Sequence, residues 1–192
     1  MARQPSAVLA GPGYLFYADA SSAVEAAPTA APADPSTDPA GNWEDAGYTD
    51  DGVAFEWDLG YEDIEVAESA TPLRTLWTEA EYRLVAVLAQ FELETLQLAL
   101  NGGTITPITG PPVERSFAPP TIGNDHAWSI LFQFSNENAA GSFLYMQLAK
   151  NTASASIPFT KAPQKSTIAI EMTAQVPDSG NIWDLREYVS AS

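Results

Sequence analysis

The chain contains no cysteine and few bases, and both shortages exclude classes of function. Its 192 residues include one His and eight Lys or Arg against 25 Asp or Glu, which gives a net charge of −17. Without cysteine there is no disulfide framework and no thiolate chemistry. Proteins that bind phosphate backbones need clustered Lys and Arg, so a nucleic-acid-binding protein is not expected.

Long apolar runs are also missing. No stretch approaches the roughly 18 consecutive apolar residues of a membrane span, and the N-terminus "MARQPSAVLAGPG" has no apolar run of the length found in secretory signals. We therefore expect a soluble protein, made in a reducing cytoplasm, that makes no membrane contact. The length suits a single domain over residues 1–192.

Catalytic and metal-binding motifs are absent as well. His126 is the sole histidine, so a site built on several histidines is impossible. The "TDDG" at residues 49–52 lacks the ligand spacing of a calcium loop, and no phosphate-binding glycine loop or nucleophile elbow occurs. Pairs of carboxylates could serve a glycosidase, but 25 acidic residues make chance pairs unavoidable. We expect no enzyme activity and no catalytic, metal or cofactor site.

Strand-like segments dominate what is present. Residues 14–19, 128–135, 141–150 and 166–176 are rich in apolar and aromatic residues, and residues 128, 130, 132 and 134 would form one apolar face. In "FELETLQLALNGG" the helical spacing of Leu93, Leu96 and Leu100 predicts a short helix over residues 92–100, ended by Asn-Gly-Gly. These signals predict a mainly β protein, an antiparallel β-sandwich or barrel with one flanking α-helix and long loops.

One loop is long enough to need its own account. Residues 21–42 are rich in Ala, Pro, Ser and Asp and include no aromatic residue, a composition that predicts a mobile loop. Loops of this length inside a compact domain are uncommon. Both a functional segment and a tolerated insertion are open.

The acidic residues gather near the N-terminus. Residues 1–68 hold 14 of the 25 acids and only one base, Arg3. Within them "GYTDDGVAFEWDLGYEDIEV" (residues 47–66) predicts two strands around a two-residue turn at Leu59-Gly60, although a bulged turn or a register shifted by one stays open because leucine is a poor first turn residue. The next segment, residues 71–90, predicts two further extended segments around residues 79–80.

This predicted hairpin has two unlike sides. One side would carry only acidic charges, from Glu56, Asp58, Asp63 and Glu65, with Glu62 turned away from them. Like charges facing each other across a sheet are destabilising. The other side would pack apolar residues against the core, namely Val53, Phe55, Trp57, Ile64 and Val66.

A family resemblance begins in the same region. The run from Trp43 to Val53, "WEDAGYTDDGV", resembles the "W-x-D-x-G-Y-T-x-D-G-V" segment of major tail (tail tube) proteins from long-tailed, non-contractile bacteriophages. The similarity continues through "IEVAESATPLRT" and "YRLVAVLAQFELETLQLALNGG", so it covers residues 43–103 in the same order and spacing. The C-terminal half is similar only in being rich in strands.

The resemblance implies a structural virion protein. Such subunits are β-sandwich-like with one helix, six of them form a ring whose inner strands close into a β-barrel, and stacked rings make the tube that carries DNA from capsid to host. It further implies that the chain assembles with itself in the host cytoplasm, becomes part of the virion tail, and meets the tape measure protein, the tail terminator and tail tip proteins. DNA would pass through without specific binding.

The same resemblance suggests roles for the residues of the hairpin and the helix. Glu56, Asp58, Asp63 and Glu65 would line the lumen and repel DNA, with an outer-surface location as the alternative. The apolar side of the hairpin, together with Leu93, Leu96 and Leu100, would be core or subunit interface. A different class of function is a virion or cell-surface carbohydrate-binding β-sandwich module, in which Trp43, Tyr48 and Tyr61 would form a sugar platform.

Overall fold

A computed structural model of the chain describes residues 9–29, 32, 34–64, 74–110, 114–136, 141–154, 156–157 and 166–187. The described residues form a helix, α1 (Leu93–Ala99), and antiparallel strands, so the predicted mainly β fold class is confirmed. The strands are β1 (Leu9–Asp19), β2 (Glu44–Asp45), β3 (Thr49–Ile64), β4 (Arg74–Leu88), β5 (Thr104–Ile108), β6 (Glu114–Ala118), β7 (Trp128–Asn136), β8 (Gly141–Asn151), β9 (Ile168–Ala174) and β10 (Trp183–Glu187).

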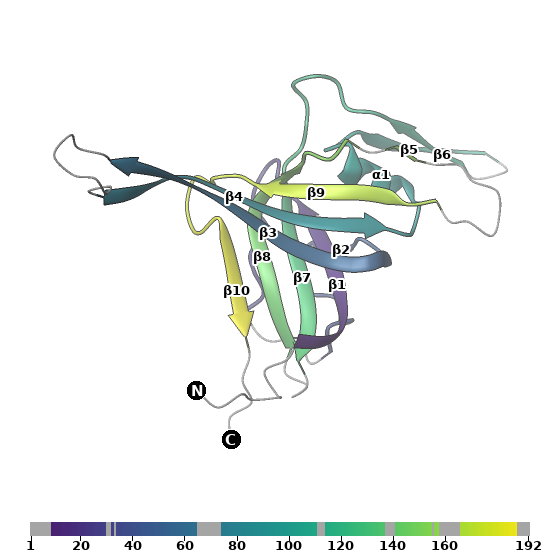
Figure 1. Cartoon of the computed structure of the whole chain (residues 1–192). Coiled ribbons are helices and arrows are strands. Elements are labelled where there is room, and N and C mark those ends of the chain that lie inside the picture. The colour runs from purple at the N-terminus through teal and green to yellow at the C-terminus, as the bar shows by residue number, and fades with distance from the viewer. Residues whose placement is uncertain are drawn as a thin grey trace.

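One sheet of eight strands folds over on itself. Its order is β2-β1-β7-β8-β9-β4-β3, with β10 also pairing with β8. β8 pairs with β10 over residues 142–146 and with β9 only over residues 149–151. β9, β4 and β3 therefore leave the plane of β1, β7 and β8 and run across it (Figure 1). β5 and β6 form a separate hairpin.

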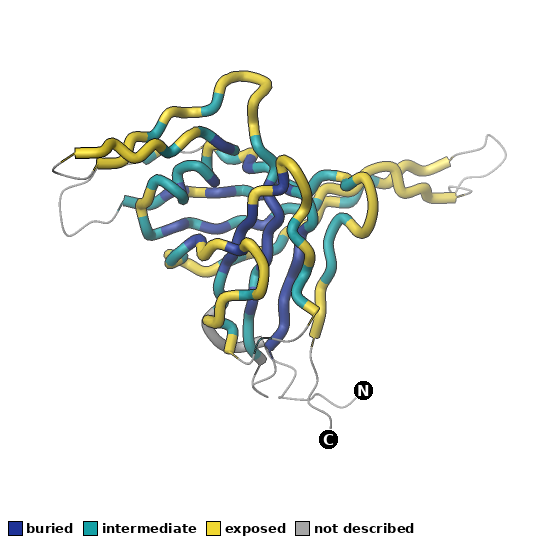
Figure 2. The backbone as a smooth tube through the Cα atoms, turned by 180° about the vertical axis from the view of Figure 1, so that it is seen from behind, coloured by how far each residue is buried: buried dark blue, intermediate teal, exposed yellow. Residues whose placement is uncertain are grey.

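The main core lies between the two parts of this sheet. Alternate side chains of each strand point to the same face, and Trp128 and Ile130 of β7 are buried there with Phe132 packed against the cluster, which confirms the predicted apolar face. Figure 2 shows the buried segments crossing in the centre of the molecule. The buried partners from the other strands are Leu15, Tyr17, Leu84, Ala86, Leu88, Leu144, Met146, Ile168, Ile170 and Met172.

The long connection from β1 to β2 contacts the opposite face of β1, β7 and β8. A smaller buried cluster lies there, made of Phe16, Ala18, Trp43, Leu131, Phe143 and Tyr145. The backbone N–H of Glu25 donates to Ser129 Oγ at 3.1 Å, and the Tyr145 hydroxyl donates to the Glu25 carbonyl at 2.6 Å. The predicted loop therefore includes a stretch around Glu25 that is hydrogen-bonded to the sheet, while its mobility in the free subunit stays a prediction.

Helix α1 has the predicted extent but a different buried face. It begins after the capping residue Glu92 and ends before the Asn-Gly-Gly segment, as predicted. Its buried residues are Thr95 and Leu98, and Leu98 has no exposed surface. The leucines predicted to be buried are half-buried or exposed: Leu93 and Leu96 are intermediate and Leu100 is 44% exposed.

The rotation of α1 follows from a polar clamp at its C-terminus. The Asn101 side-chain amide donates to the Asn151 carbonyl, and the Asn151 backbone N–H donates to Asn101 Oδ1, both at 2.7 Å. The Asn151 amide also donates to the Ala99 carbonyl at 2.6 Å. These bonds fix the end of the helix on β8. The contact with the sheet therefore buries the side of α1 that carries Leu98, not the side with the predicted leucine spacing.

β3 and β4 form one long hairpin, so the predicted turn at Leu59-Gly60 is wrong. β3 continues to Ile64 and β4 starts at Arg74, which puts the reversal within residues 65–73, outside the described residues. A primed turn requires positive φ, which leucine resists, and Gly60 is not one of the glycines with positive φ. The predicted division of residues 71–90 into two segments is wrong for the same reason.

The continuous hairpin also replaces the predicted cross-strand pairs. A two-residue turn at Leu59-Gly60 would set Asp58 opposite Tyr61 and Glu56 opposite Asp63. In the structure Asp58 pairs with Glu81 and Glu56 pairs with Arg83. The register shifts between Gly60 and Tyr61 because β4 has one extra residue there, which is a β-bulge. Since the extra residue is on β4, the alternation of side chains along β3 is not interrupted.

Candidate functional site

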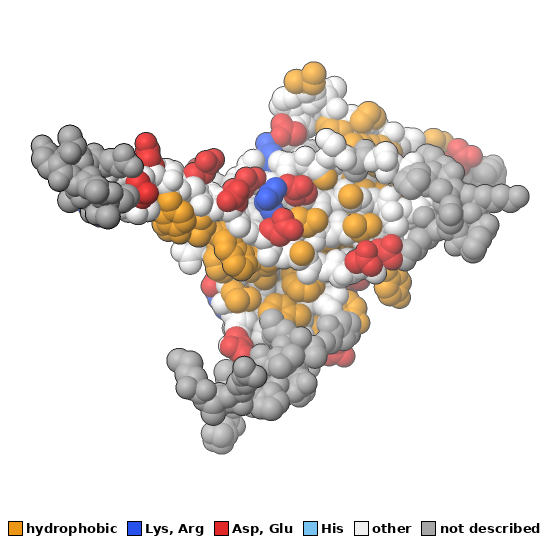
Figure 3. Space-filling model, in the orientation of Figure 1, with side chains coloured by type: hydrophobic (Ala, Val, Ile, Leu, Met, Phe, Trp, Pro, Cys, Tyr) orange, Lys and Arg blue, Asp and Glu red, His pale blue; other side chains and the backbone are white. Residues whose placement is uncertain are grey.

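One face of the β3–β4 hairpin is acidic. Alternation along β3 turns Glu56, Asp58 and Glu62 to the same side, and the register adds their neighbours on β4. All of these acidic side chains are exposed except that of Glu171 on β9, which lies opposite Val85 and is half-buried. This surface, called the acidic face, consists of Glu56, Asp58, Glu62, Glu79, Glu81 and Glu171; red side chains follow the hairpin in Figure 3.

Arg83 interrupts the acidic face at its inner end. Its guanidinium lies 3.0 Å from Glu171 Oε1 and 3.8 Å from Glu56 Oε2. The hydrogen bond that Arg83 donates to Glu171 is the largest cause that raises the pKa of Arg83 above its ordinary value. Further out, Asp58 stands directly opposite Glu81, an arrangement that costs free energy unless water separates the charges. Among the described residues no ion pair involves Asp58, Glu62, Glu79 or Glu81, so they are water-facing carboxylates, with Leu76 and Arg74 of β4 on the same side further out.

The predicted acidic set is only partly brought together. Glu56 and Asp58 share a face, but Asp63 lies on the other side of β3, where its Oδ1 accepts a hydrogen bond from Thr75 Oγ1 at 2.6 Å. Glu62 lies on the acidic face instead of Asp63, because β3 does not turn at Leu59-Gly60 and its side chains keep alternating between the two sides. Glu65 lies outside the described residues.

Sequence reasoning missed the contribution of β4. Glu79, Glu81 and Arg83 alternate with Ala80 and Tyr82, and this period of two is the signal that could have found them. The break predicted at residues 79–80 hid it, because a turn there would have separated Glu79 from Glu81. β4 instead continues and sets both acids beside those of β3.

The opposite face of β3 is apolar, and it changes character along the strand. Val53 and Phe55 are half-buried and pack against the main core. Trp57 is 63% exposed and Ile64, on the acidic side by alternation, is 40% exposed, so neither belongs to the core of this chain. Their predicted alternative role, as interface residues, stays a prediction. Val66 lies outside the described residues.

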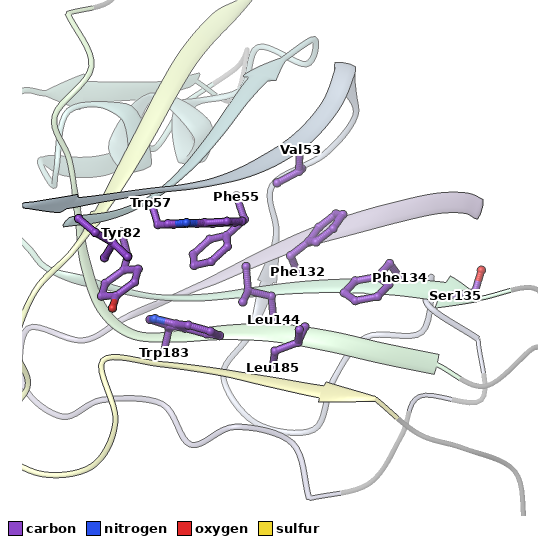
Figure 4. A pocket seen from close by; sticks show the side chains of 11 residues that line it. Val53, Phe55, Trp57, Tyr82, Phe132, Phe134, Ser135, Leu144, Trp183 and Leu185 are labelled. Carbon is purple, nitrogen blue, oxygen red and sulfur yellow. The ribbon is translucent and has the colours of Figure 1, made fainter. Parts of the chain in front are cut away.

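An open apolar groove begins where Phe55 and Trp57 leave the core. It encloses about 710 Å³ between β3 and β4 on one side and β7, β8 and β10 on the other (Figure 4). From β3 and β4 it is lined by Val53, Phe55, Trp57, Leu59 and Tyr82. From the other strands it is lined by Phe132, Phe134, Ser135, Leu144, Trp183 and Leu185.

Aromatic contacts hold the inner end of this groove. The Phe55 ring stacks on Tyr82 with centroids 6.4 Å apart, and Trp183 of β10 lies 5.2 Å from Phe55 and 5.7 Å from Tyr82. β10 was not predicted from the sequence, since "WDLRE" is short and mostly polar. Its pairing with β8 brings Trp183 under the hairpin.

In the described part of the chain, no group of three or more His, Cys, Asp or Glu is arranged to hold a metal ion. His126 lies in a loop, with Nδ1 3.3 Å from Asp19 Oδ2 and its ring 5.9 Å from that of Trp128. Among the described helices none has the length and apolar character needed to cross a membrane.

Comparisons with known proteins agree with the sequence resemblance. The family described as phage tail tube protein matches residues 1–190. None of the curated proteins compared with the chain matches it. The family match extends far beyond the resemblance over residues 43–103 and includes β7, β8, β9 and β10. The chain therefore belongs to the phage tail tube protein family, whose members are structural components of a bacteriophage tail and assemble into a tube.

Proposed function

We propose that six copies of this chain form a ring, that rings stack into the tail tube, and that the acidic face lines the lumen through which DNA passes. The observation that supports this most is the acidic face itself. It covers one side of β3 and β4, while the other side of the same strands packs on the core or borders the apolar groove. A sheet with one water-facing side, on which carboxylates outnumber the two arginines Arg74 and Arg83, is suited to the wall of a channel.

The physical basis is repulsion between like charges. Carboxylates facing a lumen repel DNA phosphates over about a Debye length, roughly 8 Å at physiological salt, and so keep water and cations between DNA and wall. The cost to the protein is small, because exposed charges interact at high effective dielectric. Asp58 opposite Glu81 is tolerated for that reason.

Ring closure requires a sheet edge that can pair with a neighbour, and β3 supplies one. It is the last strand in the order of the large sheet, so its outer edge has no partner strand among the described residues. Unpaired edges invite pairing with another chain, and six such junctions would close the inner strands into a barrel. In this proposal the tape measure protein occupies the lumen during assembly in the host cytoplasm, and the terminator and tip proteins bind the ends of the tube.

The test reverses charge on the acidic face without touching its ion pairs. In phage carrying Asp58→Lys with Glu62→Lys, tubes should still form, because both side chains are exposed. DNA ejection should be slowed at least several-fold, with partial recovery at high salt, because each subunit presents two new phosphate-binding cations. Negative-stain images would count the tubes, and time-resolved DNA release would measure ejection.

A matched control separates location from charge. Asp178→Lys changes an exposed acid between β9 and β10 that is not one of the acidic-face residues, and should leave ejection at the wild-type rate. If the double variant forms normal tubes and ejects DNA as fast as this control does, the acidic face does not line the lumen.

A further inference from the structure

We infer that the apolar groove and the aromatic side of the arm form one continuous contact surface, and that a second copy of this chain covers it in the tube. The arm is the outer part of the β3–β4 hairpin, residues 61–64 and 74–80, which projects from the body (Figures 1 and 2). The inference rests on the proposed ring only in requiring that copies meet side by side.

The surface is continuous because the same side of β3 carries it from body to arm. Trp57 lines the groove and is 63% exposed. Tyr61, four residues further and on the same side, is 62% exposed and pairs with Trp77 of β4, which is 60% exposed. These three rings and the groove are called the aromatic strip. Figure 3 shows apolar side chains under the arm, next to the acidic ones.

The lining of the groove restricts its occupant. The chain has 25 acidic residues, yet none of the lining residues is charged, so neither a polyanion nor a cation is suited to it. A sugar needs several placed polar groups, and the lining offers only one serine hydroxyl, one tyrosine hydroxyl and two indole N–H groups. The aromatic strip also extends beyond the groove along the arm. These features match a protein interface, in which aromatic residues are enriched and charges depleted.

Geometry favours a second copy as that protein. The arm extends away from its own body, and every described arm residue is exposed, so no described part of the same chain covers Tyr61 and Trp77. β3 is also the open edge of the sheet, and a neighbour that pairs with this edge would have its body next to the underside of the arm. Because both copies are strongly negative, apolar contact rather than charge attraction has to hold them together.

Photo-crosslinking in assembled tails tests the inference directly. Trp77→p-benzoylphenylalanine keeps an aromatic side chain at the position, and irradiation of purified tails should give a covalent dimer of this chain. Mass spectrometry should locate the bond on a body residue of another copy. Tyr48, 79% exposed and outside the aromatic strip, is the matched control and should crosslink at least several-fold less. Tails that form normally but give no dimer from position 77, or crosslinks only to another tail protein, would overturn the inference.

Substitution supplies an independent readout. The double variant Tyr61→Ser with Trp77→Ser should fold with an unchanged melting temperature but yield tubes at least ten-fold less often. The single variant Trp77→Phe, which keeps an aromatic ring, should assemble as wild type does. If the serine variant forms tubes as readily as wild type, the aromatic strip is not an interface. This failure differs from failure of the proposed function, in which tubes form through the aromatic strip but charge reversal on the acidic face leaves DNA ejection unchanged.

Discussion

The two halves of β4 behave differently although they pair with the same strand. Residues 74–81 are all exposed, whereas from residue 82 onward buried residues alternate with half-buried ones, ending in Leu84, Ala86 and Leu88. The inner half also pairs with β9 and faces the core. The outer half has β3 as its only partner strand among the described residues.

Apolar residues do not become rarer where burial ends. Phe55 packs against the core, and the same side of β3 continues with the half-buried Leu59 and with Trp57 and Tyr61, which are exposed. From Phe55 to Glu62, apolar residues on one side of β3 alternate with acidic residues or glycine on the other, and this pattern breaks only at Asp63 and Ile64. It indicates which side of the hairpin avoids water, but the covering layer comes from this chain in the body and, we propose, from a neighbour in the arm.

The body should be sensitive to a single core substitution. Leu98→Ala removes a fully buried side chain from the main core and should lower the free energy of unfolding by about 2–5 kcal/mol. Leu96→Ala, two residues away and only half-buried, should cost less than half as much. Chemical denaturation of both variants measures the difference, and equal losses would mean that α1 buries its leucine stripe.

A smaller, pH-dependent effect is expected at the edge of the body. Arg115 of β6 forms an ion pair with Glu94 of α1, and its hydrogen bond holds the pKa of Glu94 below the ordinary glutamate value. A lowered folded-state pKa adds stability at neutral pH that is lost as the pH falls through that pKa. Glu94→Gln should therefore be slightly less stable than wild type near pH 7, by far less than Leu98→Ala.

Acid removes this difference, because a protonated Glu94 no longer pairs as an anion. Thermal melts of wild type and Glu94→Gln at pH 7 and below pH 4 would measure it. A gap that stays constant across this range would show that the ion pair contributes nothing.

The smallest effect on the fold should come from removing the arm. Leu59 pairs with Ala80, so replacing residues 60–79 by Asn-Gly would close the hairpin with a favoured two-residue turn. Because the described residues removed are mostly exposed, the free energy of unfolding should change by no more than about 1 kcal/mol. Tube formation, counted by negative stain, should be lost.

This deletion tests whether the outer half of β4 is independent of the folded body. If removing residues 60–79 unfolds the protein, the arm is part of the cooperative body and the contrast between the two halves of β4 is wrong. If the shortened chain folds and still forms normal tubes, the arm needs no neighbour.

Several features of this protein were determined by the sequence alone. Period-two apolar residues in 128–134 predicted β7 and its buried face, and the Asn101 segment predicted the end of α1, because these signals are local and physically strong. The family resemblance over residues 43–103 came from the order of short motifs. The mainly β class followed from the number of such strands.

Tertiary structure decided which residues share a surface. Leu59-Gly60 has the composition of a weak turn, yet β3 pairs with β4 without interruption as far as Ile64. Because side chains alternate along this continuous strand, Glu62 lies on the acidic face and Asp63 lies on the opposite side. The Asn101–Asn151 hydrogen bonds, between residues 50 positions apart, choose Leu98 as the buried leucine of α1. Local sequence cannot specify these outcomes, because strand register and helix rotation depend on partners that are distant along the chain.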